Sequence, residues 1–237
     1  LGNGSLVVAI ALGARLSQAD RAIASTPAAL VAQGQLAYDQ GDFTTAASLW
    51  ERSERGYRQS RDLSGVAGSQ INRAQALVAM GFDRRACKLL TETMGVNVDV
   101  CGVAMPKLQP TTLPRHLQVL GLNSLGDVLR SLGNFEAAQS ILARAVAIAT
   151  PLGDDDRLPI FASIANTWRD LGNRERNRMG RLGTPAATIA KCPLVEPPRW
   201  GIAVADGKPA DAATYYQRAI ACYRQAGTLA AQLDRLS

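Results

Sequence analysis

The side chains best suited to nucleophilic or metal chemistry are one histidine, His116, and four cysteines, Cys87, Cys101, Cys192 and Cys222. A Cys–His nucleophile would require Cys87 or Cys101 to fold against His116. A structural zinc site would ordinarily contain a Cys-x-x-Cys pair, which is absent. No Gly-x-Ser-x-Gly elbow and no Walker-type phosphate loop occurs either. We therefore expect no enzymatic activity, no metal site and no cofactor, and we interpret His116 as a surface residue at a helix start.

Two charged runs could attract ions or nucleic acid. The acidic run 154–156 lacks the remaining ligand spacing of a cation-binding loop, so we interpret it as favourable negative charge before a helix that begins near Leu158. Arg174, Arg176, Arg178 and Arg181 face only Glu175, and the net charge is +6. No aromatic side chains interleave these arginines as a stacking platform for bases would need. We interpret the run as a solvated loop, and nucleic-acid binding is not supported.

The cysteines fall in two kinds of segment. Cys87 and Cys222 lie in helical patterns, whereas Cys101 and Cys192 lie in the two long loops, 95–113 and 180–209. In an exported protein we favour the pairs Cys87–Cys101 and Cys192–Cys222, each holding a loop to a nearby helix. Three connectivities are open to four cysteines. The alternative is two buried small side chains and two free loop thiols.

The N-terminal segment suggests export. Residues 6–12 are apolar and are followed by Ser17-Gln18-Ala19, so we expect residues 1–19 to be the remnant of a secretory signal peptide. Arg15 is atypical there, and a frayed helix is the alternative. The chain begins with Leu, which favours a fragment or a processed product and a periplasmic or extracellular location. We expect no membrane span, since spanning takes about 20 apolar residues.

The elements that must position any site are helices. Hydrophobic residues make up 47% of the chain and aromatic residues only 5%. Abundant Ala and Leu favour closely packed helices over a β-sandwich, which would be richer in Val, Ile, Thr and Tyr. We predict an all-α protein.

The chain repeats itself around four glycines, Gly41, Gly81, Gly133 and Gly172. A small residue precedes each by seven positions: Gly34, Ala74, Gly126 and Ala165. Alanine follows the first three by five positions, at Ala46, Ala86 and Ala138, and a large apolar residue by nine, at Trp50, Leu90 and Leu142. The fourth unit has Asn177 at the alanine position and loses this second half.

These offsets predict pairs of helices in close contact. The small residue allows the second helix to approach the first, and the glycine ends the first helix in the left-handed conformation. We expect the alanine to face the small residue, and the bulky residue to fill the groove between neighbouring units.

This pattern resembles the tetratricopeptide repeat. Residues 123–149 look like a near-complete unit, 33–53 and 72–90 like two more, and 161–173 with 210–227 like a split fourth. The resemblance implies antiparallel helix pairs stacked in a right-handed α-solenoid over residues 27–227. We expect units at about 27–60, 64–94, 113–150 and 157–227, the last with insertion 180–209, and a further helix or tail at 228–237.

The resemblance also implies a scaffold that binds a protein or peptide in a groove lined by the first helices. Positions expected to face the partner are Gln35, Tyr38, Arg73, Asn123 and Asp127, with Trp200 as an aromatic contact in the second loop. The loops 95–113 and 180–209 are either flaps beside the groove or tolerated insertions.

The glycines lie 40, 52 and 39 residues apart, wider than the family's usual repeat of about 34. Spacing near 40 with insertions is similar to the repeat regions that precede caspase-like CHAT domains in bacterial proteins. That resemblance implies an alternative function, the N-terminal regulatory or sensor region of a protease whose catalytic domain lies beyond Ser237.

Overall fold

The computed structural model describes residues 26–102, 104–179, 189, 191–193, 203–204, 208–209 and 212–233. The expected signal-peptide remnant, residues 1–19, and the expected partner contact at Trp200 lie outside the described residues.

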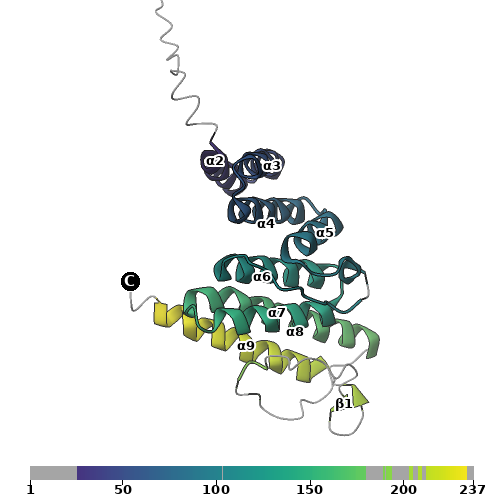
Figure 1. Ribbon diagram of the computed structural model, residues 1–237. Coiled ribbons are helices and arrows are strands. Elements are labelled where there is room, and N and C mark those ends of the chain that lie inside the picture. Colours follow the sequence, from purple (N-terminus) through teal and green to yellow (C-terminus); the bar gives the residue numbers. More distant parts are fainter. Residues whose placement is uncertain are drawn as a thin grey trace, which may run out of the picture.

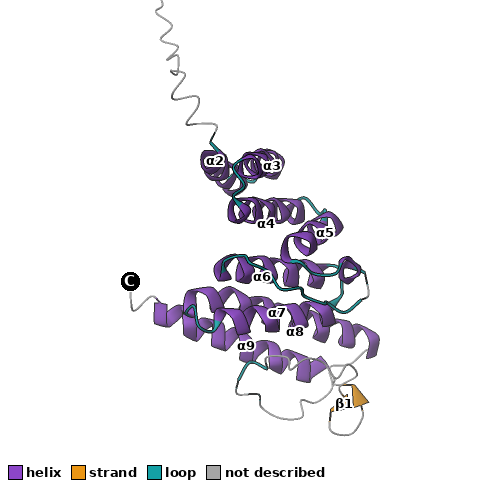
Figure 2. Ribbon diagram, in the orientation of Figure 1, coloured by secondary structure: helices purple, strands orange, loops and turns teal. Residues whose placement is uncertain are grey.

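The described chain is helical, which confirms the all-α prediction (Figure 2). Its helices are α2 (Pro27–Asp39), α3 (Phe43–Gln59), α4 (Leu63–Ala79), α5 (Asp83–Met94), α6 (Arg115–Ser131), α7 (Phe135–Ala149), α8 (Asp154–Met179) and α9 (Ala212–Leu233). A 3-10 turn, η1, covers Val98–Cys101. Two two-residue strands, β1 (Ala203–Val204) and β2 (Lys208–Pro209), pair antiparallel.

Consecutive helices pack as pairs, and the pairs stack along one direction from α2 to α9 (Figure 1). A continuous core of buried residues runs from α4 to α9, and a smaller cluster around Trp50 fills the first pair. Each pair therefore buries its apolar face against its neighbour, which is how a helical-repeat solenoid is stabilised. The architecture is that of a tetratricopeptide-like solenoid.

One turn geometry joins the helices of the first three pairs. Gly41, Gly81 and Gly133 have φ of +81°, +78° and +80°, in the left-handed region that glycine adopts at least cost. The residue after each glycine donates its backbone N–H to a carbonyl five residues earlier, which closes the helix end. These are the glycines expected to end the first helices.

The link between α3 and α4 repeats this turn without glycine. Arg61 has φ of +58°, and the Asp62 N–H donates to the Tyr57 carbonyl at 2.9 Å. The Asp62 carboxylate then accepts from the Gly65 N–H at 2.9 Å and caps α4. The connection between the first two pairs is therefore as tight as the turns within them.

The fit inside each pair differs from the expected one. A Cβ added to Gly34 would lie 2.5 Å from Nε1 of Trp50, and one added to Gly126 would lie 2.6 Å from Cγ of Leu142. In these two pairs the bulky residue therefore covers the small residue of its own pair, although it was expected in the groove between neighbouring units. The reason is that antiparallel helices match at equal distances from their turn, and helical side chains lean back toward the N-terminus.

The fourth pair departs further from the predicted pattern. Gly172 does not end a helix, because α8 continues through it to Met179 and also begins earlier than the expected Leu158. A Cβ on Gly172 would lie 2.8 Å from Cε1 of Tyr216 on α9. Gly172 thus provides the close approach that Gly34 and Gly126 provide elsewhere. Residues 228–233, expected to start a further helix or tail, belong to α9.

Two disulfides hold the loops to the helices. Cys87 on α5 is joined to Cys101 at the end of η1, and Cys192 is joined to Cys222 on α9. These are the pairs favoured from the sequence, and no cysteine remains free.

We predict that Gly126→Ala lowers the free energy of unfolding by about 1–3 kcal/mol, because its methyl group would overlap Leu142 in the packed core. The gain in helix propensity of about 1 kcal/mol offsets only part of this loss. Gly68→Ala on α4 is the matched control, since its nearest atom is Leu117 Cδ2 at 4.0 Å. Chemical denaturation of the two variants measures both effects, and equal stabilisation by both would contradict the proposed fit.

Candidate functional site

A hollow of about 390 Å³ lies between the first helices of the first three pairs, α2, α4 and α6. Three of the residues expected to face a partner line it: Tyr38 from α2, and Asn123 and Asp127 from α6. Its other lining residues are Ala74, Gln75, Val78, Ala79, Leu90, Leu120, Ser124 and Val128. The structure therefore brings together side chains that are up to 90 residues apart in the sequence.

Helix periodicity explains this lining. Residues 120, 123, 124 and 127 recur at intervals of three and four, so they share one face of α6. On α4, Ala74 and Ala79 leave space because their side chains are short. Leu120 is 39% exposed, which is high for a large apolar side chain. We did not expect Leu120, Gln75 or Ser124 at the site, although the spacing around Asn123 carried the signal for two of them.

The polar side chains of the hollow differ in whether they have hydrogen-bond partners. The Asn123 Oδ1 atom is buried and has no hydrogen-bond partner. The Asp127 carboxylate accepts a hydrogen bond from the Ser163 hydroxyl at 2.9 Å and lies 3.6 Å from Nε of Arg130. Arg130 in turn pairs with Asp170 at 2.7 Å. Asp127 is held from behind by α8, whereas Asn123 leaves one acceptor unused.

Burial shifts the titration of Asp127. Desolvation raises the pKa of this carboxyl above its ordinary value of 3.8, while the Ser163 hydrogen bond and the Arg130 charge oppose the shift. Asp127 is the one lining residue with a carboxyl group. The hollow is therefore mainly apolar, with a single carboxylate at its edge.

The other expected contacts lie elsewhere. Gln35 is exposed on α2, where its amide donates to Asp39 at 2.8 Å, and it does not line the hollow. Arg73 was expected to face the groove, but its side chain points to α3, where it approaches Glu51 at 3.9 Å and Glu54 at 3.2 Å. The reason is rotational: positions 74, 75, 78 and 79 of α4 face the hollow, so Arg73 faces away from it.

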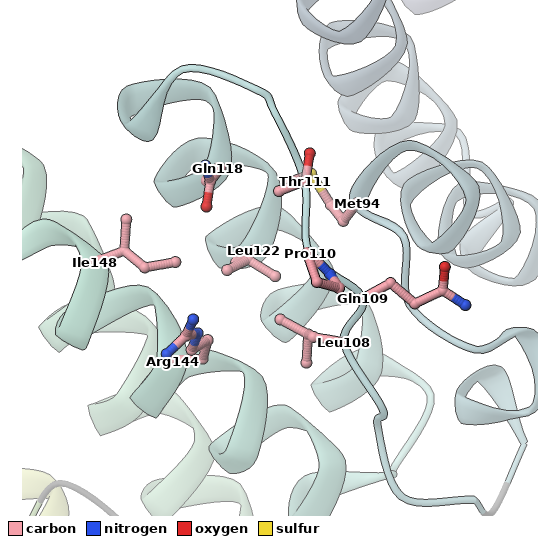
Figure 3. A pocket seen from close by; sticks show the side chains of 9 residues that line it. All are labelled: Met94, Leu108, Gln109, Pro110, Thr111, Gln118, Leu122, Arg144 and Ile148. Atoms are coloured by element: carbon pink, nitrogen blue, oxygen red, sulfur yellow. The ribbon is translucent and has the colours of Figure 1, made fainter.

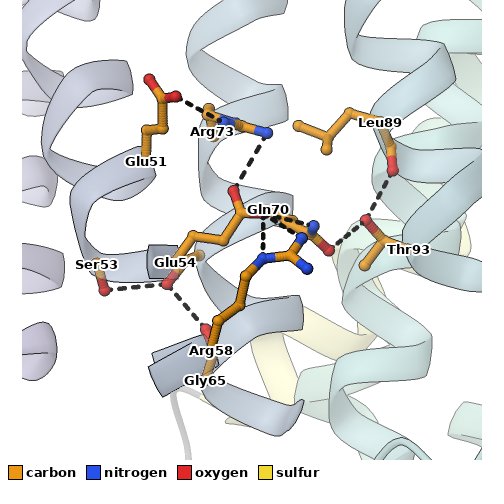
Figure 4. A network of polar contacts seen from close by, with 10 residues as sticks. Glu51, Ser53, Glu54, Arg58, Gly65, Gln70, Arg73, Leu89 and Thr93 are labelled. Carbon is orange, nitrogen blue, oxygen red and sulfur yellow. Dashed lines mark hydrogen bonds and ion pairs between the residues drawn. The ribbon is translucent and has the colours of Figure 1, made fainter. Parts of the chain in front are cut away.

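Arg73 belongs instead to a polar network among α3, α4 and α5 (Figure 4). Its centre is the buried Glu54, whose Oε1 accepts from Arg58 at 2.6 Å and from Gln70 at 2.8 Å. Gln70 accepts in turn from the Thr93 hydroxyl at 3.0 Å. Because removing one partner of a buried charge strands the other, we assign this network to holding the first two pairs together.

The histidine, cysteines and arginines considered for chemistry and nucleic-acid binding lie in several places among the described residues. His116 is exposed at the second position of α6, and both cysteines considered as its partners are oxidised. Among the described residues, no cluster of histidine, cysteine or acidic side chains is arranged to hold a metal ion. Arg174, Arg176 and Arg178 lie on α8 and not in a loop. Arg174 pairs with Glu136 at 3.2 Å, and Arg178 pairs with Glu175 at 2.8 Å. Arg181 lies outside the described residues.

The comparisons with known proteins agree with the fold. A tetratricopeptide repeat family model matches residues 121–150, which include Gly126, its covering residue Leu142 and the turn at Gly133. No curated protein and no solved structure matches the chain significantly. The match and the stacked helix pairs together support a tetratricopeptide-type repeat protein, a class whose repeats generally bind proteins or peptides. No helix in the described ranges has the length and apolar character needed to cross a membrane.

We predict that Asp127 makes the protein less stable as pH rises. A carboxyl whose pKa is raised by folding binds its proton more tightly in the folded state, so stability is greatest below the unfolded pKa and falls as pH rises through the folded pKa. Asp127→Asn removes this titration. The difference in unfolding free energy, wild type minus variant, should therefore decrease between about pH 3 and about pH 6. An increase with pH would show that Arg130 and Ser163 outweigh burial.

Proposed function

We propose that this chain is a non-catalytic scaffold whose four helix pairs, between residues 27 and 227, present the α2–α4–α6 hollow to a peptide or protein segment. The observation that carries the proposal is the unpaired Asn123 acceptor within a mainly apolar hollow. A buried acceptor without a donor costs about 1–3 kcal/mol. This oxygen has almost no accessible surface in the free chain, so a partner's N–H would recover that cost by a turn of the Asn123 side chain toward the hollow.

The side chains that line the hollow suit one apolar side chain of a binding partner as the anchor. Val78, Leu120 and Val128 surround the hollow and suit one aliphatic or aromatic side chain of the partner. Asn123 lies one turn from Asp127, so an N–H donor beside that anchor would reach an amide oxygen or a carboxylate. The lining offers one carboxylate and no adjacent nucleophile–base pair, so the proposal assigns binding and no reaction to this hollow.

The disulfides support a proposal on compartment. Disulfides persist in oxidising environments and are rare in reducing ones. Both long loops are fastened in this way, at Cys87–Cys101 and Cys192–Cys222. We propose that the chain works in an exported, oxidising compartment.

The binding proposal is tested by selecting peptides from a random display library on the immobilised protein and measuring their affinities for two variants. Leu120→Glu places a charge in the hollow, whereas Leu63→Glu changes a side chain that is 68% exposed and lies outside it. We expect selected peptides to lose affinity at least about tenfold on Leu120→Glu, since an unpaired charge faces the apolar anchor.

Affinity for Leu63→Glu should equal that of the wild type. Peptides that bind Leu120→Glu and wild type equally would place the binding surface elsewhere. Circular dichroism of both variants separates loss of binding from loss of fold.

A second hypothesis concerns the polypeptide to which the repeats belong. The 40-residue spacing between Gly41 and Gly81, which both end first helices, favours the regulatory region of a larger CHAT-type protease. Coding sequence beyond Ser237 decides it: a caspase-like His and Cys pair would support this role, and an unrelated sequence or a stop codon would remove it.

A further inference from the structure

The loop between α5 and α6 forms an arch that is fastened at several points. The Cys87–Cys101 disulfide holds its first half to α5. The Asn134 amide donates to the carbonyls of Val100 at 3.0 Å and Gly102 at 3.1 Å. These contacts hold the arch in one conformation, whereas a loop of this length without them would be mobile.

The second half of the arch is held as well. Val96 and Leu108 form an antiparallel bridge, and the Gln109 N–H donates to the Gly95 carbonyl at 2.9 Å. Near α6, the Gln118 amide donates to the Leu113 carbonyl at 2.6 Å. The arch is thus supported at both ends, and residues 108–111 of its second half lie beside α6 and α7.

A hollow of about 400 Å³ lies under this part of the arch (Figure 3). Arg144 and Ile148 enter it from α7 on one side, Leu108 and Pro110 from the arch on the other, and Leu122 from α6 between them. Its volume is within the range of about 300–1,000 Å³ that is typical of small-molecule sites. It is separate from the α2–α4–α6 hollow, because the two share no lining residue.

The charge of this hollow is unbalanced. Arg144 is exposed at its rim, and its side chain has no ion pair or hydrogen bond within the described part of the chain. The residues that line the hollow include no carboxylate. By contrast, Arg130 on α6 forms an ion pair with Asp170, and Arg174 on α8 forms one with Glu136. Five apolar side chains, three neutral polar ones and one unpaired guanidinium line the hollow, which makes it complementary to an anion that carries an apolar body.

We propose that this hollow binds a small carboxylate with an unbranched apolar tail, the carboxylate at Arg144 and the tail against Leu108, Leu122 and Ile148. A nucleotide or polyphosphate is disfavoured, because the lining holds one cation and no helix N-terminus. The arch closes one side, so the hollow admits a tail more readily than a chain that must enter and leave. The apolar C-terminal residue of a peptide shares the same chemistry, and the experiment separates the two sources.

The test is a titration of the full chain with hexanoate, octanoate and decanoate below their micelle concentrations, followed by calorimetry and by NMR of the Ile148 and Leu122 methyl groups. We expect saturable shifts of these methyl groups and an affinity that rises about fourfold per added methylene until the hollow is filled. Decan-1-ol has the same tail without charge and should bind about fivefold more weakly than decanoate.

Arg144→Gln should abolish the difference between decanoate and decan-1-ol. Arg84→Gln on α5 is the matched control, since Arg84 is also exposed but does not line the hollow. The absence of saturable shifts at Ile148 would overturn the proposal, as would equal decanoate affinity for wild type and Arg144→Gln. Binding of N-acetyl-leucyl-leucine without binding of decanoate would also overturn it and would identify a peptide C-terminus as the ligand.

Discussion

The contact between a side-chain-free backbone and a large apolar side chain recurs through this structure, and the helix pairs depend on it. Gly34 lies under Trp50 and Gly126 under Leu142, at distances that leave no room for even one methyl group. Trp50 adds a hydrogen bond from its indole N–H to the Val31 carbonyl at 3.2 Å, so this fit is also directional. Because interiors are packed as densely as organic crystals, a small change at such a contact is transmitted to the whole pair.

The spacing that these contacts set also determines the surfaces available for binding. With each second helix drawn close, the first helices α2, α4 and α6 stand side by side and leave the hollow that contains Asn123 and Asp127. The network centred on Glu54 holds α3 against α4 and α5, which fixes the angle between the first two pairs. The same helices therefore provide both the binding surface and the internal packing. One side of α4 lines the hollow, and another side contacts Glu54 of α3.

Much of the fold was predictable because its signals are local. Helix-ending glycines and small residues at fixed offsets depend on neighbours in sequence, and Gly41 and Gly133 behave as their positions indicated. The errors arose where a long-range contact decides the outcome. Gly172 follows a small residue by seven positions, as Gly133 does, but it lies inside a helix under Tyr216. Arg61 adopts the left-handed turn conformation although it is not glycine. At the site, the sequence predicted the helices but not their rotation, so it did not show that Arg73 points toward Glu51 and Glu54 of α3.

Trp50 of α3 rests directly on the backbone of Gly34 in α2, and NMR measures this contact without altering the protein. We expect nuclear Overhauser effects between the indole protons of Trp50 and the Hα protons of Gly34, and Hα resonances displaced from their random-coil position by the ring current. Gly34 Hα protons at random-coil positions with no Overhauser effect to the indole would contradict the account, since the first pair would then be held together in some other way.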